Sequence, residues 1–243
     1  MIYDIAGLRV LIHNRHAYTT KFCKAYLADD QLSPVDLTAS VTESEMQTER
    51  ECSPGFSDGY IENICLYRSI CVQIPTKNRF LLHSSILEHN GNAYAFLGRS
   101  GTGKSTHTKL WLQYVHGTRV LNGDKPILEF ANGEFIVHGT PWQGKENWGY
   151  KGKAPLKGLC FLEQAKENSI VRLSTAETSS RIFQQVLLPS DETNVVATLD
   201  LMDKLVANVP AYLLKCDISE EAVKHSFEKL TQTNYVSLPS KED

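Results

Sequence analysis

Apolar and polar residues in the first part of the chain follow the spacing of short strands. The run "LRVLIH", Leu8 to His13, is apolar enough for a strand, and "VDLTASV", Val35 to Val41, alternates with the period of two that a half-buried strand needs. The acidic, serine-rich run from Thr42 to Gly59 has no such period, and we predict a solvated loop there. Residues 1–57 are therefore expected to form a small, β-rich N-terminal subdomain.

A helical pattern follows this subdomain. From Tyr60 to Ile74 the apolar side chains recur close to i, i+3, i+4 and i+7, which predicts an amphipathic helix, and Pro75 is expected to stop it. Such a helix packs against a core and carries no chemistry.

Two β-hairpins are predicted next. The apolar runs Phe80 to Glu88 and Ala93 to Leu97 flank Asn90-Gly91, and a second pair of runs flanks Asn132-Gly133. Asn-Gly is a strong hairpin signal because both residues tolerate a positive φ. Antiparallel hairpins beside strands joined by helices imply a mixed sheet, so the expected fold class is α/β with a partly antiparallel sheet.

The remaining pattern predicts strands and helices in alternation. We expect strands at 118–122, 159–163 and 211–216, and helices near 175–185 and 191–207. A last helix is expected to begin at Ser219, whose hydroxyl can cap it and which is followed by two acids. The tail "LPSKED" is predicted to fray.

Composition and charge narrow the class of protein. The chain has 243 residues, a net charge of −3 and a pI near 6.2, which do not favour a nucleic-acid partner. No window approaches the ~20 apolar residues that span a bilayer, and the start of the chain has no basic segment before its apolar run, so we expect a cytoplasmic protein without a membrane partner. The six cysteines form no C-x-x-C pair and are expected to be mostly reduced and buried.

One stretch carries a complete phosphate-binding motif. Residues 98–105 fit G-x-x-x-x-G-K-[ST], the Walker A pattern, between a predicted strand and a predicted helix. Backbone N–H groups of such a loop point at phosphate oxygens, the lysine holds the β- and γ-phosphates, and the hydroxyl binds Mg²⁺. The predicted nucleotide-binding residues are Gly98, Arg99, Ser100, Gly101, Thr102, Gly103, Lys104, Ser105 and Thr106.

Further candidates lie on both sides of this motif. Asp124 follows the next predicted strand and could coordinate the metal with Ser105 or accept a proton from an incoming hydroxyl, although "NGDKP" could also be an ordinary turn. His83, in a strand of the first hairpin, could reach the γ-phosphate, or it could be a structural residue. His107, in the first turns of the loop helix, is expected on the helix surface or facing a substrate.

A long segment, Gly139 to Gly158, combines glycine, tryptophan and lysine without a strong period. Ordered loops of this length tend to be functional. Its lysines, including Lys145, could face a phosphorylated or carboxylated ligand, and Trp142 could pack on it; the alternative is that the tryptophans anchor a core and the lysines form a solvated rim.

The motifs "LLHSS", "GRSGTGKSTHTKLW" and "LNGDKP", in this order, resemble the C-terminal kinase domain of HPr kinase/phosphorylase and, more distantly, phosphoenolpyruvate carboxykinase. The likeness is greatest to small stand-alone HPr-kinase-like proteins and covers residues from Asp58 to the last helix. It implies an HPr-kinase-like nucleotide-binding domain over residues 58–243, with a carboxykinase-like core, ATP or another nucleoside triphosphate, and Mg²⁺. By this resemblance, Lys104, Asp124 and His83 are the catalytic residues.

The sequence departs from the family's pattern at two places. Gly123 stands where HPr kinases have the first aspartate of a pair, so Asp124 must serve alone or with help, for which Glu146 is the candidate. His138-Gly139 replaces the family's arginine-glycine signature, and the N-terminal domain of the protein-phosphorylating enzymes has no expected counterpart.

The sequence therefore predicts a phosphotransferase that moves the γ-phosphate of ATP to a hydroxyl of a small molecule or of a protein serine. The expected partners are the nucleotide and that acceptor, and self-association is left open. The alternative is a nucleotide-binding regulator or NTPase switch that releases no phosphorylated product. A carboxykinase-type lyase and a binding protein without chemistry are further alternatives.

Overall fold

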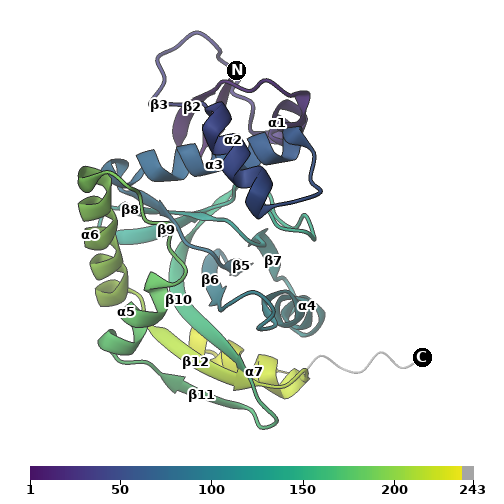
Figure 1. The fold of residues 1–243 in the computed structure, drawn as a ribbon. Coiled ribbons are helices and arrows are strands. Elements are labelled where there is room, and N and C mark those ends of the chain that lie inside the picture. The colour runs from purple at the N-terminus through teal and green to yellow at the C-terminus, as the bar shows by residue number, and fades with distance from the viewer. Residues whose placement is uncertain (237–243) are drawn as a thin grey trace. The chain divides into compact units, whose positions relative to one another are not determined.

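The computed structural model describes residues 1–236, which divide into two compact units (Figure 1). Unit 1 comprises Met1–Phe80 and Leu187–Leu199, and unit 2 comprises Leu81–Val186 and the described residues from Asp200 onward. The boundary differs from the predicted one after residue 57, because helix α3 (Asp58–Gln73) packs against elements that precede it in the chain. Strand β4 (Arg79–Leu81) and helix α6 (Glu192–Asn208) cross from one unit to the other.

Unit 1 contains a small sheet and several helices. Strands β1 (Ile2–Ile5) and β2 (Leu8–Ile12) pair antiparallel, and β3 (Leu37–Ala39) pairs with β2 in parallel, which confirms the two predicted strands. The helical elements are α1 (Ala17–Phe22), η1 (Lys24–Tyr26), α2 (Glu43–Cys52), α3 and η2 (Pro75–Lys77). Helix α3 and its end before Pro75 are as predicted.

The prediction of a loop from Thr42 to Gly59 is wrong, because helix α2 occupies most of it. The Thr42 hydroxyl accepts a hydrogen bond from the Glu45 amide (3.2 Å), and the Glu45 carboxylate accepts one from the Thr42 amide (2.7 Å). This reciprocal pair is a capping box, and its T-x-x-E signature is visible in the sequence. The helix is polar on most sides and buries Met46.

Unit 2 is built on a mixed sheet. Its strands are β5 (Ser85–His89), β6 (Asn92–Leu97), β7 (Arg119–Asn122), β8 (Ile127–Ala131), β9 (Glu134–His138), β10 (Lys153–Gln164), β11 (Ser169–Arg172) and β12 (Ala211–Cys216). The order along the sheet is β8-β9-β10-β6-β5-β7, with β12 also on β10 and β11 on β12. Strand β10 pairs in parallel with β6 and β12, whereas β5-β6 and β8-β9 are antiparallel. The mixed α/β fold class is confirmed.

Both predicted Asn-Gly hairpins form. Asn90 and Gly91 have φ of 49° and 73°, and Asn132 and Gly133 have φ of 52° and 82°. All four lie in the left-handed region that the turns require. The run Phe80 to Glu88, however, is not one strand, because the chain leaves the strand conformation after Leu82 and resumes it at Ser85.

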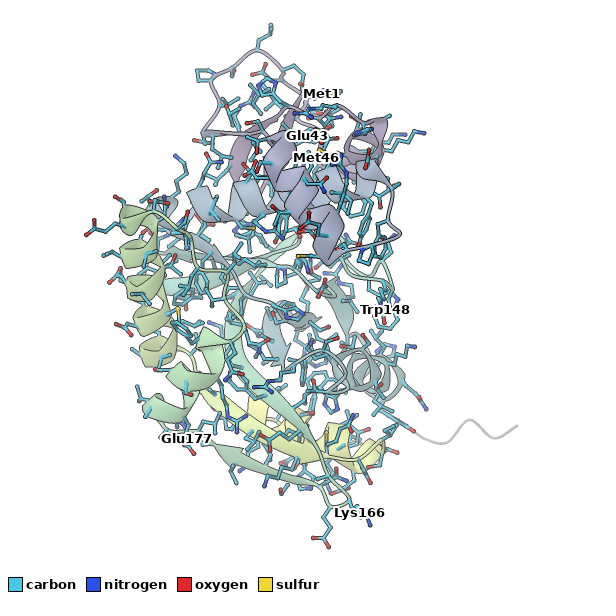
Figure 2. All side chains as sticks on the ribbon, in the orientation of Figure 1. Met1, Glu43, Met46, Trp148, Lys166 and Glu177 are labelled. Atoms are coloured by element: carbon cyan, nitrogen blue, oxygen red, sulfur yellow. The ribbon has the colours of Figure 1, made fainter. Side chains whose placement is uncertain are left out.

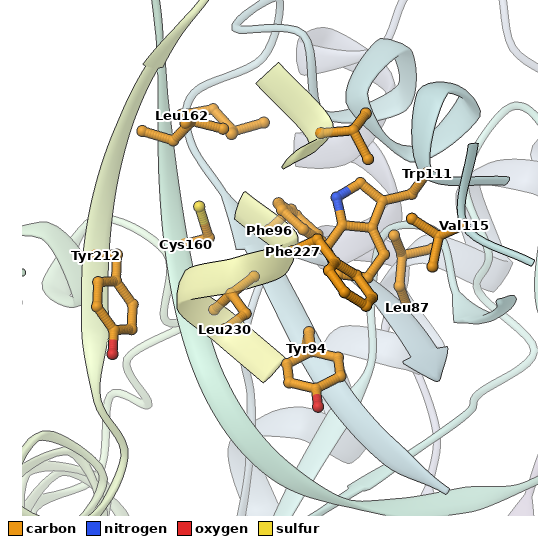
Figure 3. Close-up of a cluster of buried hydrophobic side chains, with 12 residues drawn as sticks. Leu87, Tyr94, Phe96, Trp111, Val115, Cys160, Leu162, Tyr212, Phe227 and Leu230 are labelled. Atoms are coloured by element: carbon orange, nitrogen blue, oxygen red, sulfur yellow. The ribbon is translucent and has the colours of Figure 1, made fainter. Parts of the chain in front are cut away.

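Three more helices complete unit 2: α4 (Lys104–Tyr114), α5 (Thr175–Phe183) and α7 (Glu220–Thr231), whose first turn is capped by the Ser219 hydroxyl as predicted. Helices α4 and α7 cover one face of the sheet. The cluster in Figure 3 joins Trp111 of α4, and Val115 directly after it, to Phe227 and Leu230 of α7 over alternate strand residues such as Phe96. On the opposite face, the Arg181 guanidinium of α5 lies over the Phe161 ring.

The cysteines form no disulfide bonds, as the sequence predicts. All six cysteines are free thiols; four are buried, Cys52 is exposed and Cys216 is half-buried. The predicted frayed tail lies outside the described residues. Within residues 1–236, no helix has the length and apolar composition that crossing a bilayer demands.

Candidate functional site

The phosphate loop joins strand β6 to helix α4 through backbone that only glycine adopts readily. Gly98 has a φ of 152°, and a Cβ there would lie 2.5 Å from the Thr102 hydroxyl oxygen. Gly103, with a φ of 103°, stands at the N-terminal end of α4. The loop therefore leads directly into a helix N-terminus, where unpaired N–H groups and the helix dipole favour an anion.

Lys104 lies across this loop. Its Nζ donates hydrogen bonds to the carbonyl oxygens of Gly98 (2.7 Å) and Arg99 (3.3 Å). Burial lowers the pKa of Lys104, and the Asp124 carboxylate opposes that shift. An ammonium group held on two carbonyl oxygens is a cation available to a bound phosphate.

Asp124 lies between two basic side chains. Its Oδ1 is 3.0 Å from His83 Nε2, and its Oδ2 is 3.1 Å from Lys125 Nζ. Burial alone would raise the pKa of Asp124, but the hydrogen bond from His83 and the charge of Lys125 outweigh it and lower the pKa to about 2. Asp124 is therefore ionised at neutral pH, a form that suits a metal ligand.

The prediction that His83 lies in a strand is wrong, but the structure brings it to Asp124. His83 occupies the break between β4 and β5, where its amide donates to the Gln185 carbonyl oxygen at 2.8 Å. The next amide, that of Ser84, donates to the Asp124 carbonyl oxygen at 3.1 Å. The break in the strand thus fixes the backbone that carries the imidazole.

A buried asparagine shapes the turn that carries Asp124. The Asn122 side-chain oxygen accepts hydrogen bonds from the amides of Asp124 (2.9 Å) and Lys125 (2.8 Å). Its side-chain nitrogen donates to the Thr140 hydroxyl at 3.0 Å, and that hydroxyl donates to the Lys125 carbonyl oxygen at 2.7 Å. These hydrogen bonds hold the backbone of the turn that carries Asp124 on a buried side chain.

Gly123 explains why this turn has a single acid. Its amide donates to the Trp148 carbonyl oxygen at 2.9 Å, and a Cβ added to Gly123 would lie 2.7 Å from the Gln143 carbonyl oxygen. Both neighbours are backbone atoms, which cannot swing away as a side chain would. An aspartate at this position would require the neighbouring loop to move.

That neighbouring loop, which follows β9, is held along β7. The Tyr150 hydroxyl donates to the Glu88 carboxylate, which also accepts from Arg119 at 2.9 Å, and the Arg119 guanidinium lies over the Tyr150 ring. Trp148, labelled in Figure 2, carries Lys109 Nζ above its ring at 5.6 Å. The segment is therefore an ordered wall, as expected from its composition.

The loop brings a second carboxylate towards Asp124. A Cβ built on Gly144 would lie 3.6 Å from Asp124 Cγ and 3.8 Å from Glu146 Oε2, so the two acids flank the same point. Lys145 is in the same turn and is exposed. Trp142, by contrast, is 5% exposed and lines none of the cavities around the phosphate loop, so the prediction that it packs on a ligand is not supported.

The phosphate-loop pocket, of about 490 Å³, collects most of the predicted site residues. It is lined by His83, Ser100, Gly101, Gly103, Lys104, Ser105, Thr106, Gly123, Asp124, Lys125, Gly144, Lys145 and Glu146. Three lysines and two carboxylates therefore surround one cavity at the helix N-terminus. Lys125 and Asn122 were not predicted as site residues, and their only sequence signal is their position beside Asp124.

Gly98, Arg99 and Thr102 face a different cavity. They line the α5 cavity, of about 680 Å³, which is also bounded by Phe161, Glu163 and residues of α5. Arg99 Nη2 donates to Gln184 Oε1 there at 3.4 Å. Of the predicted loop residues, these three line no part of the pocket that contains Asp124, whereas the others line it.

Comparison with known proteins shows a weak likeness to solved structures. No family model and no curated protein matches the chain. Among solved structures, the Hpr(Ser) kinase/phosphatase from Coxiella burnetii is 13% identical, with a TM-score of 0.36 over 63% of this chain and 88% of that chain. At this identity and TM-score the likeness carries no argument about activity, and the family resemblance of the motifs stays a prediction.

Proposed function

We propose that the protein is an ATP- and Mg²⁺-dependent phosphotransferase that moves the γ-phosphate to a hydroxyl group. The observation that supports this proposal best is the juxtaposition of Lys104 with the His83–Asp124 pair in one pocket at the end of a complete phosphate loop. A loop that only holds nucleotide needs the lysine and the backbone amides. An imidazole bonded to a carboxylate adds a means of moving a proton.

In the proposed transfer, groups of this pocket accept the proton and stabilise the charge that the reaction produces. The acceptor oxygen forms a bond to the γ-phosphorus, the bond from that phosphorus to the β–γ bridging oxygen breaks, and ADP leaves. When the neutral His83 ring donates from Nε2 to Asp124, its Nδ1 carries no hydrogen and takes the proton of the acceptor hydroxyl. Lys104 and the amides of the loop stabilise the charge on the phosphate oxygens, which is the main contribution to catalysis in phosphoryl transfer.

The oxygen donors present fit Mg²⁺. Among the described residues no group of three or more His, Cys, Asp or Glu side chains could hold a metal by itself. That suits Mg²⁺, which is commonly held by one or two carboxylates together with phosphate oxygens and water. Asp124 and the Ser105 hydroxyl would hold the ion, with Glu146 as a further acid, and the ion would neutralise charge on the phosphates during transfer. Each Asp124 oxygen keeps a lone pair beyond its bond to His83 or Lys125.

The acceptor is proposed to be a small hydroxyl-bearing molecule or a protein serine. The alternative, a nucleotide-dependent switch that only hydrolyses ATP, uses the same phosphate loop and differs in its product. We propose the transferase because His83 and Asp124 form a ready proton acceptor beside Lys104.

³¹P NMR of the protein with Mg-ATP distinguishes these functions. We expect a new phosphoester resonance when pooled amino acids, sugars and hydroxy acids are added, and none with Lys104→Ala or Asp124→Asn. Inorganic phosphate as the only new product, with the acceptors present, would favour the switch. Absence of any turnover by the wild-type protein under all these conditions would contradict both.

A further inference from the structure

A second cavity adjoins the phosphate-loop pocket at the first turn of α4. It has a volume of about 440 Å³ and shares Gly103 and Thr106 with the phosphate-loop pocket. The α5 cavity shares no residue with that pocket. The remaining walls of the second cavity are Thr102, His107, Leu110, Gln164, Ala165, Cys216, Asp217 and Ile218.

The shared residues indicate the direction in which a nucleotide would extend. Lys104, Ser105 and Asp124 define the phosphate-loop pocket as the place of the terminal phosphates and the metal. The amides at the start of α4 hold the phosphates nearer the nucleoside. A triphosphate that crosses Gly103 and Thr106 therefore brings its nucleoside to the second cavity.

The walls of this cavity combine apolar and polar side chains. Leu110, Ala165 and Ile218 supply apolar surface, and the Ile218 side chain is exposed (76%) at its edge. Gln164 holds the phosphate loop on this side, because its Nε2 donates to the Gly101 carbonyl oxygen at 3.1 Å. Small-molecule sites combine such apolar walls with a few polar groups that fix orientation.

His107 supplies a polar group, and its tautomer follows from its neighbours. The Ser226 hydroxyl donates its one hydrogen to the Val223 carbonyl oxygen (2.9 Å) and accepts from Trp111 Nε1 (2.8 Å). With the Ser226 hydrogen directed at Val223, the imidazole donates the 3.0 Å contact from His107 Nε2 to Ser226 Oγ. In the neutral ring of this tautomer, Nδ1 carries a lone pair and no hydrogen.

That lone pair has no hydrogen-bond partner among the described residues, although His107 is only 3% exposed. Burial of the ring favours its neutral form, in which Nδ1 is a hydrogen-bond acceptor. A buried acceptor without a partner costs free energy unless a ligand or water supplies a donor.

We propose that this cavity, which we call the nucleoside pocket, holds the base and ribose of the nucleotide, with His107 Nδ1 accepting a hydrogen bond from an N–H or O–H of the nucleoside. The inference rests on the proposed nucleotide-dependent function and adds the position of the nucleoside. It makes His107 a nucleoside-binding residue.

Isothermal titration calorimetry with Mg²⁺ and two ligands tests the pocket. Linear tripolyphosphate has the three phosphates of ATP without the nucleoside. Ala165→Leu fills the nucleoside pocket, and Ala176→Leu, in the α5 cavity, is its matched control. We expect Ala165→Leu to lower ATP affinity about tenfold or more and to leave tripolyphosphate affinity unchanged, since added methylene groups in a pocket change binding by this order. Ala176→Leu should change neither affinity.

The opposite pattern, in which only Ala176→Leu weakens ATP binding, would overturn the inference and assign the nucleoside to the α5 cavity. ATP binding that withstands both substitutions would also overturn it, while leaving the proposed function intact. If the wild-type protein bound neither ATP nor tripolyphosphate, the proposed function and the inference would fail together.

The role of His107 is tested by two substitutions. His107→Phe keeps a ring and removes the acceptor, whereas the side-chain oxygen of His107→Asn retains an acceptor near the position of Nδ1. We expect about a tenfold loss of ATP affinity in the first and retention in the second, with tripolyphosphate bound equally by both. An equal loss of ATP affinity in the two variants would overturn the hydrogen bond from the nucleoside.

Discussion

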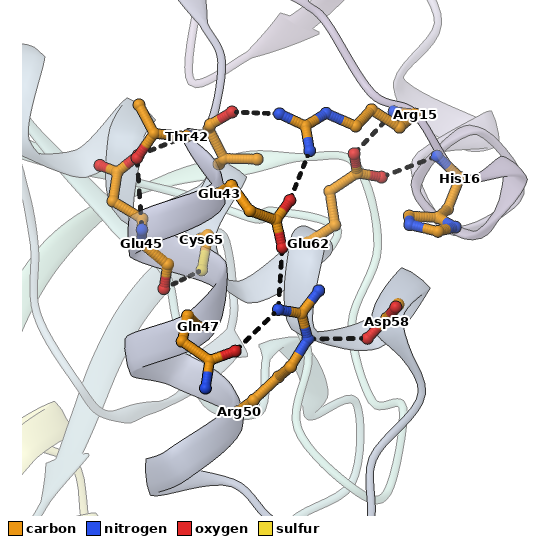
Figure 4. Close-up of polar contacts among 11 residues, drawn as sticks. Arg15, His16, Thr42, Glu43, Glu45, Gln47, Arg50, Asp58, Glu62 and Cys65 are labelled. Carbon is orange, nitrogen blue, oxygen red and sulfur yellow. Dashed lines mark hydrogen bonds and ion pairs between the residues drawn. The ribbon is translucent and has the colours of Figure 1, made fainter.

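Charged side chains gather in two regions of the molecule, and they are arranged in different ways. In unit 1, Arg50 pairs with Glu43 (2.9 Å) and with Asp58 (3.0 Å), and Arg15 pairs with the other oxygen of Glu43 (Figure 4). These carboxylates are more than half exposed. In the phosphate-loop pocket of unit 2, Lys104 and Asp124 are half-buried.

The difference lies in whether the charges satisfy one another. The network of unit 1 alternates positive and negative groups, so it needs no ligand, and exposed pairs of this kind add little stability. The phosphate-loop pocket holds more lysines than carboxylates at a helix N-terminus, in a less hydrated setting where charges interact more strongly. A surplus of partly buried positive charge is a feature that an anion would complete.

The largest effect is expected from removing Lys104, which tests whether the positive charge of the pocket binds an anion. We expect Lys104→Ala to lower the affinity for Mg-tripolyphosphate about 100-fold, because hydrogen bonds from an ammonium to phosphate are lost. Lys145→Ala, which removes an exposed lysine from the same pocket, should weaken binding much less. Titration calorimetry gives both values, and equal losses would show that charge count, and not position, governs the pocket.

A substitution of Gly123 tests why the turn has no acid immediately before Asp124 in the chain. Because an added Cβ would meet the Gln143 carbonyl oxygen at 2.7 Å, Gly123→Ala is expected to reduce the free energy of unfolding by about 1–3 kcal/mol. Urea denaturation measures this change. Glu146→Ala, in the adjoining loop and exposed, is the control and should be near neutral. A fully stable Gly123→Ala protein would contradict the crowding of this turn.

The pH dependence of stability tests the pairing of Asp124. Its pKa is lowered in the folded state, so its contribution to stability is present above the ordinary aspartate pKa and is lost as the pH falls towards about 2. Near neutral pH, Asp124→Asn should therefore be less stable than the wild-type protein by up to roughly 2 kcal/mol, and the difference should shrink below about pH 4. Urea denaturation at several pH values measures it. A difference that is independent of pH would exclude the ion pairs as its cause.

The smallest effect is expected in the exposed network of unit 1. Arg50→Gln should leave the affinity for Mg-ATP unchanged and shift the melting temperature only slightly, since its partners remain hydrated. Thermal unfolding at low and high salt measures the shift, which salt should reduce further. A large loss of nucleotide affinity in this variant would break the distinction between the two regions.

Much of the fold could be predicted from periodicity and turn residues. The Asn-Gly hairpins, α3, and the Ser219 cap of α7 formed as expected, because each depends on local chemistry. Helix α2 was missed because its exposed surface has no apolar period, although its capping box was readable. The boundary between the units could not be predicted from local sequence, because it depends on which earlier elements α3 packs against.

The site was predictable as far as the motif extends. The phosphate loop and Asp124 could be identified from order and spacing, and the structure brings Lys104, Ser105 and Asp124 to one pocket. The bond between His83 and Asp124, the support from Asn122 and the crowding of Gly123 depend on contacts between segments far apart in the chain. For Trp142 the sequence left a ligand contact and a core anchor open, and its burial favours the core anchor.

Strand β10 has a consequence for the order in which the chain folds. Its first residues pair with β9, while Leu156 to Phe161 pair with β6, the strand that enters the phosphate loop. Strand β6 is made long before β10 during synthesis, and pairing between distant segments is slow because the intervening chain must first be closed into a loop. A nascent chain that ends before Lys153 has the whole phosphate-binding motif but lacks one of the two strands that flank β6. The phosphate loop therefore gains the second strand beside β6 late, after the ribosome has completed β10.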